Sequence, residues 1–496
     1  MNDPAPSPRA AANPRAIRFV LDDEIVEVAD PPPTRTLLQY LREDLGRCGT
    51  KEGCAEGDCG ACTTVLGELR NGAIEYSAIN SCIRFLPTVD GMEVVTVESL
   101  GDGARLHPVQ QALVDHHASQ CGFCTPGFVM SLFALYLERE RPAKDDVIDA
   151  LSGNLCRCTG YRPIVDAATH ADDYPVPAKW SREDAQSPTR RERLQSIRRS
   201  HPLACPGFHA PQTLDELASA FAQSPGSLVL AGGTDVALWV TKLMRELPPI
   251  IYIGRVEGLG GIIEGDGMIE IGAAVSLAEA YRAIVASYPM LGEIANRFGS
   301  VPIRNSGTLC GNLANGSPIG DSMPILIALG AELRLRRGDE TRSLPLERFY
   351  LGYQKNALGP GEFVQSVRVP LPCPGRMVAS YKVSKRFDQD ISAVCGAYAI
   401  DVKDGNVVSA RIAYGGMAAI PQRAARAEVA LAGRPWSATT IIAACEAIGA
   451  DYQPMTDMRA SAAYRARVAG SLLQRFYLEH SPESPVTRVH DAALLS

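Results

Sequence analysis

The chain has 496 residues, of which 46% are hydrophobic and 21% are charged, as is usual for soluble globular proteins. This length exceeds one domain, and we expect about three to five. The net charge of −7 argues against nucleic acid as a partner. No apolar run approaches the roughly 18–20 residues that span a bilayer; the best, Met323–Leu329, contains Pro324.

Residues 1–15 are rich in Pro, Ala and Asn and lack the apolar core of a signal peptide, so we expect a disordered tail on a cytoplasmic chain. Fourteen cysteines in such a chain favour metal or redox roles over disulfides. Eight of them form two groups. The other six, which we expect to be buried as small hydrophobic side chains, are Cys48, Cys205, Cys310, Cys373, Cys395 and Cys445.

Residues 16–100 have the pattern of a small mixed sheet. Residues 17–28 alternate across an Asp-Asp turn and predict a β-hairpin. A short helix is expected over 36–45, with Leu37, Leu38, Leu41 and Leu45 facing inward. Further strands are expected at 63–69, 73–77 and 93–97. A sheet with one helix and a metal loop predicts a β-grasp ferredoxin domain.

The first cysteine group lies in this domain. Cys54, Cys59 and Cys62 have C-x4-C-x2-C spacing, and Cys82 follows, which is the ligand pattern of a plant-type [2Fe–2S] cluster. We expect Gly53, Gly57 and Gly60 to let backbone amides approach the sulfur atoms. A zinc site is the alternative, but zinc sites usually pair two C-x2-C knuckles. The single glycine-lined loop favours iron–sulfur.

Residues 101–173 change to a helical period. Helices are expected at 108–117, from Thr125 to about 140, at 145–151 and at 164–171, with Thr125 as a cap and Pro126 in the first turn. This predicts an all-helical bundle domain.

The second cysteine group lies in the bundle. Cys121 and Cys124 stand at a helix N-terminus, and Cys156 and Cys158 stand in the turn before another helix. Helix N-termini favour anionic thiolates. This spacing alone suits zinc and iron–sulfur equally, but its place after a ferredoxin domain favours a second [2Fe–2S] cluster.

Residues 174–200 contain three prolines and the charge run 190–193, without apolar periodicity. We therefore expect a solvated linker.

An α/β region is expected over residues 201–373. A helix at 214–221 and a strand at 227–230 precede the turn Ala231–Asp235, which leads into a helix through Val240. Amides of such a glycine-rich turn can reach a pyrophosphate. A second Gly/Asn-rich segment, 306–321, suits close approach to a bulky ligand. From composition alone, an ordinary pair of polar loops remains equally open.

The last region, residues 374–484, predicts an α+β domain followed by a tail at 485–496. We expect strands at 379–383, 393–402 and 409–414, and helices at 424–432, 439–448 and 460–477. It contains no metal-ligand spacing or nucleophile constellation. Lys382 is a candidate cation near a cofactor.

The phrases at 49–62, 120–127 and 154–161 closely resemble those of the iron–sulfur/FAD subunit of xanthine dehydrogenases, in the molybdenum hydroxylase family. The resemblance covers residues 17 to about 481. It implies an α+β multidomain fold: the two [2Fe–2S] domains, an FAD-binding domain of vanillyl-alcohol-oxidase (PCMH) type, and a C-terminal domain like that of CO dehydrogenase flavoprotein. By resemblance the FAD-binding residues are Val229, Leu230, Ala231, Gly232, Gly233, Thr234, Asp235, Val236, Phe298, Thr308, Gly311, Asn312, Asp321, Val364 and Lys382.

The family resemblance also implies a function. Electrons from xanthine or hypoxanthine, oxidised to urate at molybdopterin on a large partner subunit, would pass through both clusters to FAD and then to NAD. An α2β2 heterotetramer is implied, with Gln120, Cys121 and Cys158 facing the molybdopterin, and no catalytic residue in this chain. Three alternatives stay open: an aldehyde or N-heterocycle substrate, oxygen or quinone as the acceptor, and a zinc-bearing assembly scaffold without enzymatic activity.

Overall fold

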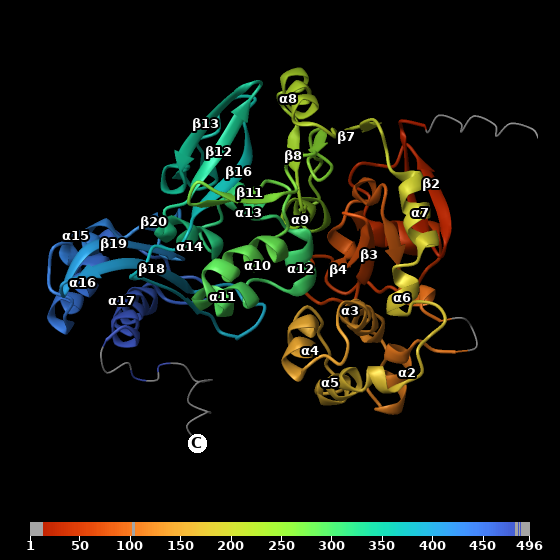
Figure 1. Cartoon of the computed structure of the whole chain (residues 1–496), viewed down its shortest axis with the longest axis horizontal. Coiled ribbons are helices and arrows are strands. Elements are labelled where there is room, and N and C mark those ends of the chain that lie inside the picture. The colour runs from red at the N-terminus through yellow and green to blue at the C-terminus, as the bar shows by residue number, and fades with distance from the viewer. Residues whose placement is uncertain (1–12, 102–104, 482–484, 486, 488–496) are drawn as a thin grey trace, which may run out of the picture. The chain divides into compact units, whose positions relative to one another are not determined.

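The computed structural model describes residues 13–101, 105–481, 485 and 487, which form two compact units (Figure 1). The first unit comprises the chain up to Gln212 together with Gly226–Arg255, and the second comprises Thr213–Pro225 and the chain from Val256 onward. The expected tails lie almost wholly outside the described residues. Within those residues, no helix is both long and apolar enough to cross a membrane.

The first unit begins with a five-stranded sheet of order β2-β1-β5-β3-β4, in which β1 and β5 are parallel and the other pairs antiparallel. Its strands are β1 (Ala16–Leu21), β2 (Glu24–Ala29), β3 (Thr63–Arg70), β4 (Ala73–Asn80) and β5 (Glu93–Val95). The predicted hairpin is present as β1 and β2. The arrangement confirms the mixed sheet expected for this region.

The helix predicted at 36–45 is shorter and changes its winding. Thr36 and Gln39 form a capping box at α1 (Leu37–Gln39), and a π-helical turn follows over Tyr40–Asp44. The wider turn rotates the next residue outward, so the prediction that Leu45 faces inward is wrong; its exposed fraction is 37%.

Four helices build the bundle: α2 (Pro108–Asp115), α3 (Thr125–Glu138), α4 (Lys144–Leu151) and α5 (Arg162–Thr169). Cys124, not Thr125, is the N-cap of α3, and Pro126 lies in the first turn as predicted. Helix α3 is buried along most of its length and packs on β3 and β4. One hydrophobic core runs from Phe128 and Phe133 to Val65 and Val95 of the sheet, so the two domains are stabilised together.

The prediction of a solvated linker over 174–200 is wrong. This stretch forms α6 (Arg182–Ala185) and α7 (Pro188–Ile197), and Leu194 and Ile197 pack against the sheet.

The buried side chain of Arg190 explains why the composition of this stretch wrongly indicated a solvated linker. Its side chain is only 4% exposed, because its guanidinium stacks 3.8 Å above the Trp180 ring and lies 2.6 Å from a carboxylate oxygen of Glu93. Asp184 accepts a further bond at 3.0 Å. An arginine that is buried by an aromatic ring and by carboxylates from other parts of the chain adds no apolar periodicity to the sequence.

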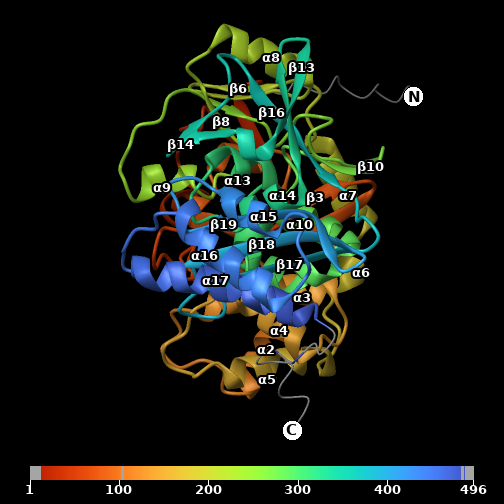
Figure 2. The same cartoon turned by 90° about the vertical axis from the view of Figure 1, so that its left-hand side faces the viewer.

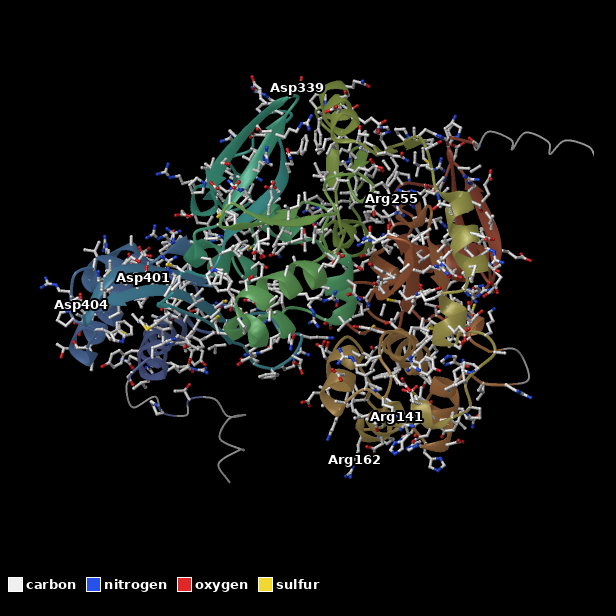
Figure 3. The ribbon with its side chains drawn as sticks, viewed as in Figure 1. Arg141, Arg162, Arg255, Asp339, Asp401 and Asp404 are labelled. Atoms are coloured by element: carbon white, nitrogen blue, oxygen red, sulfur yellow. The ribbon has the colours of Figure 1, made fainter. Side chains whose placement is uncertain are left out.

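A small sheet of order β6-β7-β9-β8 completes the first unit. Its strands are β6 (Leu203–Cys205), β7 (Phe208–Ala210), β8 (Leu228–Leu230) and β9 (Ile250–Tyr252), and α9 (Val236–Thr241) follows β8. Arg255, labelled in Figure 3, donates to a carboxylate oxygen of Glu68 at 2.5 Å and to the carbonyl of Asp90. These bonds join the small sheet to the ferredoxin sheet.

The second unit contains an antiparallel sheet of order β10-β11-β16-β12-β13. Its strands are β10 (Ile262–Gly265), β11 (Met268–Gly272), β12 (Glu332–Arg337), β13 (Glu340–Pro345) and β16 (Phe363–Pro370); β14 (Tyr350–Gly352) and β15 (Lys355–Asn356) form a separate pair. The helices are α8 (Leu214–Gln223), α10 (Leu277–Ser287), α11 (Gly292–Asn296), α12 (Val301–Ser306), α13 (Leu309–Asn315) and α14 (Ser322–Leu329). Helix α14 is buried at every residue because its sequence is apolar all round.

The C-terminal domain is the predicted α+β layer. Its antiparallel sheet runs β17 (Arg376–Val383), β18 (Val394–Lys403), β19 (Asn406–Gly415) and β20 (Gln422–Arg423). Figure 2 shows α15 (Ala425–Leu431), α16 (Ala438–Asp451) and α17 (Ala462–Glu479) covering one face of this sheet. Tyr398, Tyr414 and Phe476 form the centre of the core.

The six scattered cysteines fit their prediction only in part. Cys205, Cys310 and Cys395 are buried, and Cys445 is half-buried. Cys48 and Cys373 are exposed, which contradicts the prediction for these two.

Candidate functional site

The sulfur atoms of the first cysteine group lie in contact with one another. Cys62 immediately precedes β3 and Cys82 lies in the turn Ser81–Ile83, and their buried sulfur atoms are 3.2 Å apart. Hydrogen bonds from the thiols of Cys59 and Cys82 lower the pKa of Cys54. The four cysteines of the first group therefore lie close together.

Backbone amides face this group. The N–H groups of Asp58 and Cys59 each donate to the sulfur of Cys54 at 3.4 Å. Gly57 and Gly60 have φ of +79° and +70°, as expected for glycine. Gly53 has no positive φ, but a Cβ there would stand 2.8 Å from the sulfur of Cys59, so close approach requires glycine at this position. Sulfur atoms with amide donors suit an anionic inorganic cluster.

Asn80 is a neighbour that the sequence analysis missed. Its side chain is buried, and its amide nitrogen lies 3.9 Å from the sulfur of Cys62. Its position two residues before Cys82 was the only available signal.

The second group forms two pairs, nearer the surface. The amide of Phe123 and the thiol of Cys158 lower the pKa of Cys121 by hydrogen bonding, and both thiols are exposed. Cys124 faces Cys156, and burial raises the pKa of Cys124 to about 12. Thr159 holds the sulfur of Cys156 at 3.1 Å.

Within the described part of the chain, no three His, Cys, Asp or Glu side chains are grouped as ligands of one ion. In the second group the thiols meet in two pairs, Cys121 with Cys158 and Cys124 with Cys156. In the first group Cys54 faces both Cys59 and Cys82, and Cys82 also faces Cys62. This arrangement fits a two-iron cluster, in which each iron takes two thiolates.

Asn154 joins the two cysteine groups. Its amide donates to the carbonyl of Gly60 at 3.2 Å and accepts from the hydroxyl of Ser131 at 2.6 Å. The next residue, Leu155, donates its N–H to the carbonyl of Cys59 at 3.0 Å. A hydrogen bond therefore links a loop carrying Cys59 directly to the loop carrying Cys156. In the sequence, Asn154 stands out only as the first residue of the phrase at 154–161.

The first predicted flavin loop belongs to the first unit. Residues 229–236 run from β8 into α9, and Gly233 turns the chain with φ of +74°. Burial raises the pKa of Asp235 in this loop. The loop has the glycine-rich strand-to-helix form expected for phosphate binding.

The remaining predicted flavin residues belong to the second unit. Thr308 caps α13 by accepting from the amide of Gly311 at 3.0 Å. The side-chain oxygen of Asn312 is buried and accepts no hydrogen bond from the described residues. Phe298 stacks obliquely on Tyr281, and Val364 is buried in β16. The orphaned oxygen of Asn312 indicates a place where a ligand donor fits.

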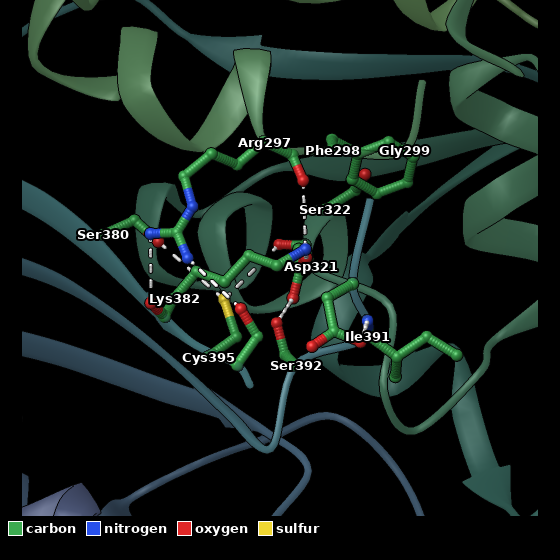
Figure 4. Close-up of polar contacts among 12 residues, drawn as sticks. Arg297, Phe298, Gly299, Asp321, Ser322, Ser380, Lys382, Ile391, Ser392 and Cys395 are labelled. Carbon is green, nitrogen blue, oxygen red and sulfur yellow. Dashed lines mark hydrogen bonds and ion pairs between the residues drawn. The ribbon is translucent and has the colours of Figure 1, made fainter. Parts of the chain in front are cut away.

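A buried ion pair stands among these residues (Figure 4). The Lys382 ammonium lies 2.9 Å from a carboxylate oxygen of Asp321 and 3.0 Å from the carbonyl of Arg297. Ser392 donates to the other oxygen of Asp321 at 2.5 Å. Arg297 and Ser392 were missed by sequence analysis, since only tertiary structure brings them to Asp321.

Four family models match the chain in order. They are the 2Fe-2S iron-sulfur cluster binding domain at residues 19–83, the [2Fe-2S] binding domain at 96–169, the FAD binding domain in molybdopterin dehydrogenase at 202–372, and the CO dehydrogenase flavoprotein C-terminal domain at 379–480. These matches confirm the predicted kinds of domain and their order.

Known proteins match the same regions. Xanthine dehydrogenase of Emericella nidulans is 31% identical over 93% of this chain and 38% of its own length, so the chain spans less than two fifths of that relative. Carbon monoxide dehydrogenase from Hydrogenophaga pseudoflava is similar in structure, with a TM-score of 0.51 and 30% identity over 54% of this chain and 94% of the other. Quinoline 2-oxidoreductase from Pseudomonas putida 86 has a TM-score of 0.50 and 25% identity over 56% and 97%.

The chain therefore belongs to the molybdenum hydroxylase family, of which it represents the electron-transfer portion with two [2Fe–2S] domains and an FAD-binding domain.

Proposed function

We propose that the chain is the electron-transfer subunit of a xanthine dehydrogenase. It carries electrons from a molybdopterin centre on a large partner subunit, where xanthine or hypoxanthine becomes urate, to NAD. When bound, the clusters supply one-electron redox chemistry, and the flavin joins single electrons into the pair that a nicotinamide accepts. The observation that carries the proposal is the joining of two cysteine quartets by the bond between Leu155 and Cys59.

The first cluster is held by Cys54, Cys59, Cys62 and Cys82. Amides of Asp58 and Cys59 donate to a ligand sulfur, which stabilises negative charge there. Burial of Cys62 and Cys82 excludes water from that end of the site.

The second cluster is held by Cys121, Cys124, Cys156 and Cys158. Its outer end is open: Cys121 and Cys158 are exposed, and the neighbouring Phe123 and Leu155 are 48% and 40% exposed. Apolar side chains around exposed ligands favour a protein partner at this end. In our proposal the molybdopterin-bearing subunit covers it in an α2β2 heterotetramer.

For FAD we propose the residues that the family resemblance implies, and each unit is considered by itself. In the first unit, amides of the glycine-rich loop 229–236 would bind the pyrophosphate, and in the second unit the buried side-chain oxygen of Asn312 would accept a hydrogen bond from the flavin cofactor. Lys382, fixed by Asp321 and the Arg297 carbonyl, supplies a cation in the second unit. We further propose that the protein works in the cytoplasm, where its fourteen cysteines stay reduced.

A second candidate keeps the architecture and changes the substrate. The structural similarity to a carbon monoxide dehydrogenase and a quinoline oxidoreductase favours this candidate. The substrate would bind on the partner, so this chain could keep the same architecture with a different substrate. The chain would then serve a different molybdenum hydroxylase.

The test uses the protein isolated with its natural partner. Iron, zinc, acid-labile sulfur and extractable FAD are measured, and reduction is followed with xanthine, hypoxanthine, an aldehyde, quinoline and carbon monoxide, with NAD, oxygen or a quinone as the acceptor. We expect about four irons and one FAD per chain, and NAD reduction by xanthine. Zinc in place of iron would instead support a scaffold, and turnover of another substrate would select the second candidate.

A further inference from the structure

Helix α9 connects the first flavin loop to the first cysteine loop. It starts at the end of loop 229–236 and ends at Thr241, and Lys242 is its C-cap, with a backbone N–H that donates to the carbonyl of Leu238 at 2.9 Å. The Lys242 ammonium donates to the carbonyl of Cys54 at 3.1 Å and lies 3.3 Å from a carboxylate oxygen of Glu56. All of these residues belong to the first unit.

The same helix also reaches the other end of the cysteine group. It packs against the turn Ser81–Ile83, which carries Cys82. A Cβ placed on Gly233 would lie 3.8 Å from the carbonyl of Ile83. Helix α9 therefore contacts both the Cys54 loop and the Cys82 turn.

Other cations near this loop bind elsewhere. Lys51 donates to the carbonyls of Cys48 and Gly49, and Arg42 to the carbonyl of Thr50. Among these three cations, Lys242 is the one that bonds to a residue of the predicted ligand set.

We propose that Lys242 is a positioning residue that raises the reduction potential of the first cluster, with Glu56 opposing it. The inference rests on the proposed function, since it assumes that Cys54 is a ligand. Reduction adds one negative charge to a cluster, so a fixed cation bonded to a ligand's carbonyl favours the reduced form. The negative carboxylate of Glu56 partly cancels that effect. Neutralising Lys242 alone should therefore lower the reduction potential, and neutralising Glu56 alone should raise it.

Solvent limits the size of the effect. The side chains of Lys242 and Glu56 are 43% and 39% exposed, so water and salt screen both charges. We expect each neutral variant to change the ratio of reduced to oxidised cluster, at fixed ambient potential, by about two- to tenfold. A tenfold change corresponds to about 59 mV for a one-electron couple.

The experiment is a potentiometric titration followed by EPR on the full protein with its cofactors. The variants are Lys242→Gln, Glu56→Gln and Lys242→Arg, and the first-cluster signal is the one that survives in Cys121→Ser. We expect Lys242→Gln to lower the midpoint potential of the first cluster, Glu56→Gln to raise it, and Lys242→Arg to stay near the parent. The second cluster is the internal control and keeps its potential. The shifts should shrink when ionic strength rises from about 0.05 to 0.5 M.

Shifts of the same sign in the two neutral variants, or no shift in Glu56→Gln, would overturn the inference while leaving the proposed function intact. If Lys242→Gln loses the cluster, Glu56→Gln still decides, because it keeps the bond between Lys242 and Cys54. Absence of any iron–sulfur signal in the parent protein would instead defeat the proposed function.

Discussion

The two cysteine quartets of the first unit place the same ligand type in opposite surroundings. Cys62 and Cys82 are buried, whereas Cys121 and Cys158 are exposed. The Gly60 turn of the first quartet is pressed against Gly153 and Asn154, while Gly122 in the second has no heavy atom within 4 Å of where its Cβ would stand. The first quartet is thus enclosed by its own chain, and the second is open toward a partner.

Ligand spacing alone therefore does not set the properties of such a site. Enclosure determines how closely water and other proteins approach the sulfur atoms, and therefore influences the reduction potential of each cluster.

The largest effect is expected from removing one ligand of each quartet. Cys62→Ser should abolish one of the two iron–sulfur EPR signals, and Cys121→Ser the other, because each signal depends on its own four thiolates. Cys373→Ser, which changes an exposed cysteine outside both quartets, is the control and should keep both signals. Retention of both signals in Cys62→Ser would contradict the assignment.

The second prediction compares one alanine in each loop. Gly60 and Gly122 have φ of +70° and +81°, so each substitution should cost about 1 kcal/mol in backbone strain. At Gly60 the new Cβ would also lie 2.1 Å from the carbonyl oxygen of Gly153. We therefore expect Gly60→Ala to lower the free energy of unfolding by at least about 3 kcal/mol, against about 1 for Gly122→Ala.

Hydrogen exchange of amides in β3 and α3 measures that difference. Equal decreases of the free energy of unfolding in Gly60→Ala and Gly122→Ala would mean that the first loop is no more tightly enclosed than the second.

The third prediction concerns the loss of folding stability at low pH. His107 is buried against Phe133 and Tyr136, with Nδ1 accepting from the amide of Val109 at 3.3 Å. Burial lowers its pKa from 6.5 to about 4. Between pH 6.5 and pH 4 the unfolded chain therefore binds more protons than the folded chain. The contribution of His107 to the free energy of unfolding is fully present above pH 6.5 and falls by about 3 kcal/mol as the pH drops to 4.

Asn at position 107 would keep an N-cap acceptor without titrating. The pH dependence of exchange in α2 and α3 should therefore flatten between pH 6.5 and 4 in His107→Asn. The same slope in both proteins would show that another group is responsible.

The smallest effect is expected at the joint between the quartets. Asn154→Ala leaves the Ser131 hydroxyl and the Gly60 carbonyl without this partner, which should cost about 1–3 kcal/mol of unfolding free energy. Ser131→Ala should cost less, and the double variant less than the sum, because the two share one hydrogen bond. Strict additivity in denaturant unfolding would exclude that coupling.

Much of the architecture could be predicted from the sequence. Cysteine spacing, alternation in β1 and β2, and the apolar face of α3 are local patterns, and the structure contains each element. The role of Arg190 could not be predicted, because Glu93 lies 97 residues away in the chain. Asn80, Arg297 and Ser392 likewise acquire their partners only through tertiary contacts. The ligand and flavin assignments remain predictions that the experiments above examine.

The segment between the matched domains has a consequence for where the chain can be divided. The family models stop at residue 169 and resume at 202, yet Arg190 and Arg199 in between pair with Glu93 and Asp90 of the ferredoxin domain. Truncation after Thr169 would strand the Glu93 carboxylate, whose pKa burial already raises, without its cation. The smallest fragment that folds autonomously should therefore extend through Arg199, and limited proteolysis of the intact protein should spare residues 182–199.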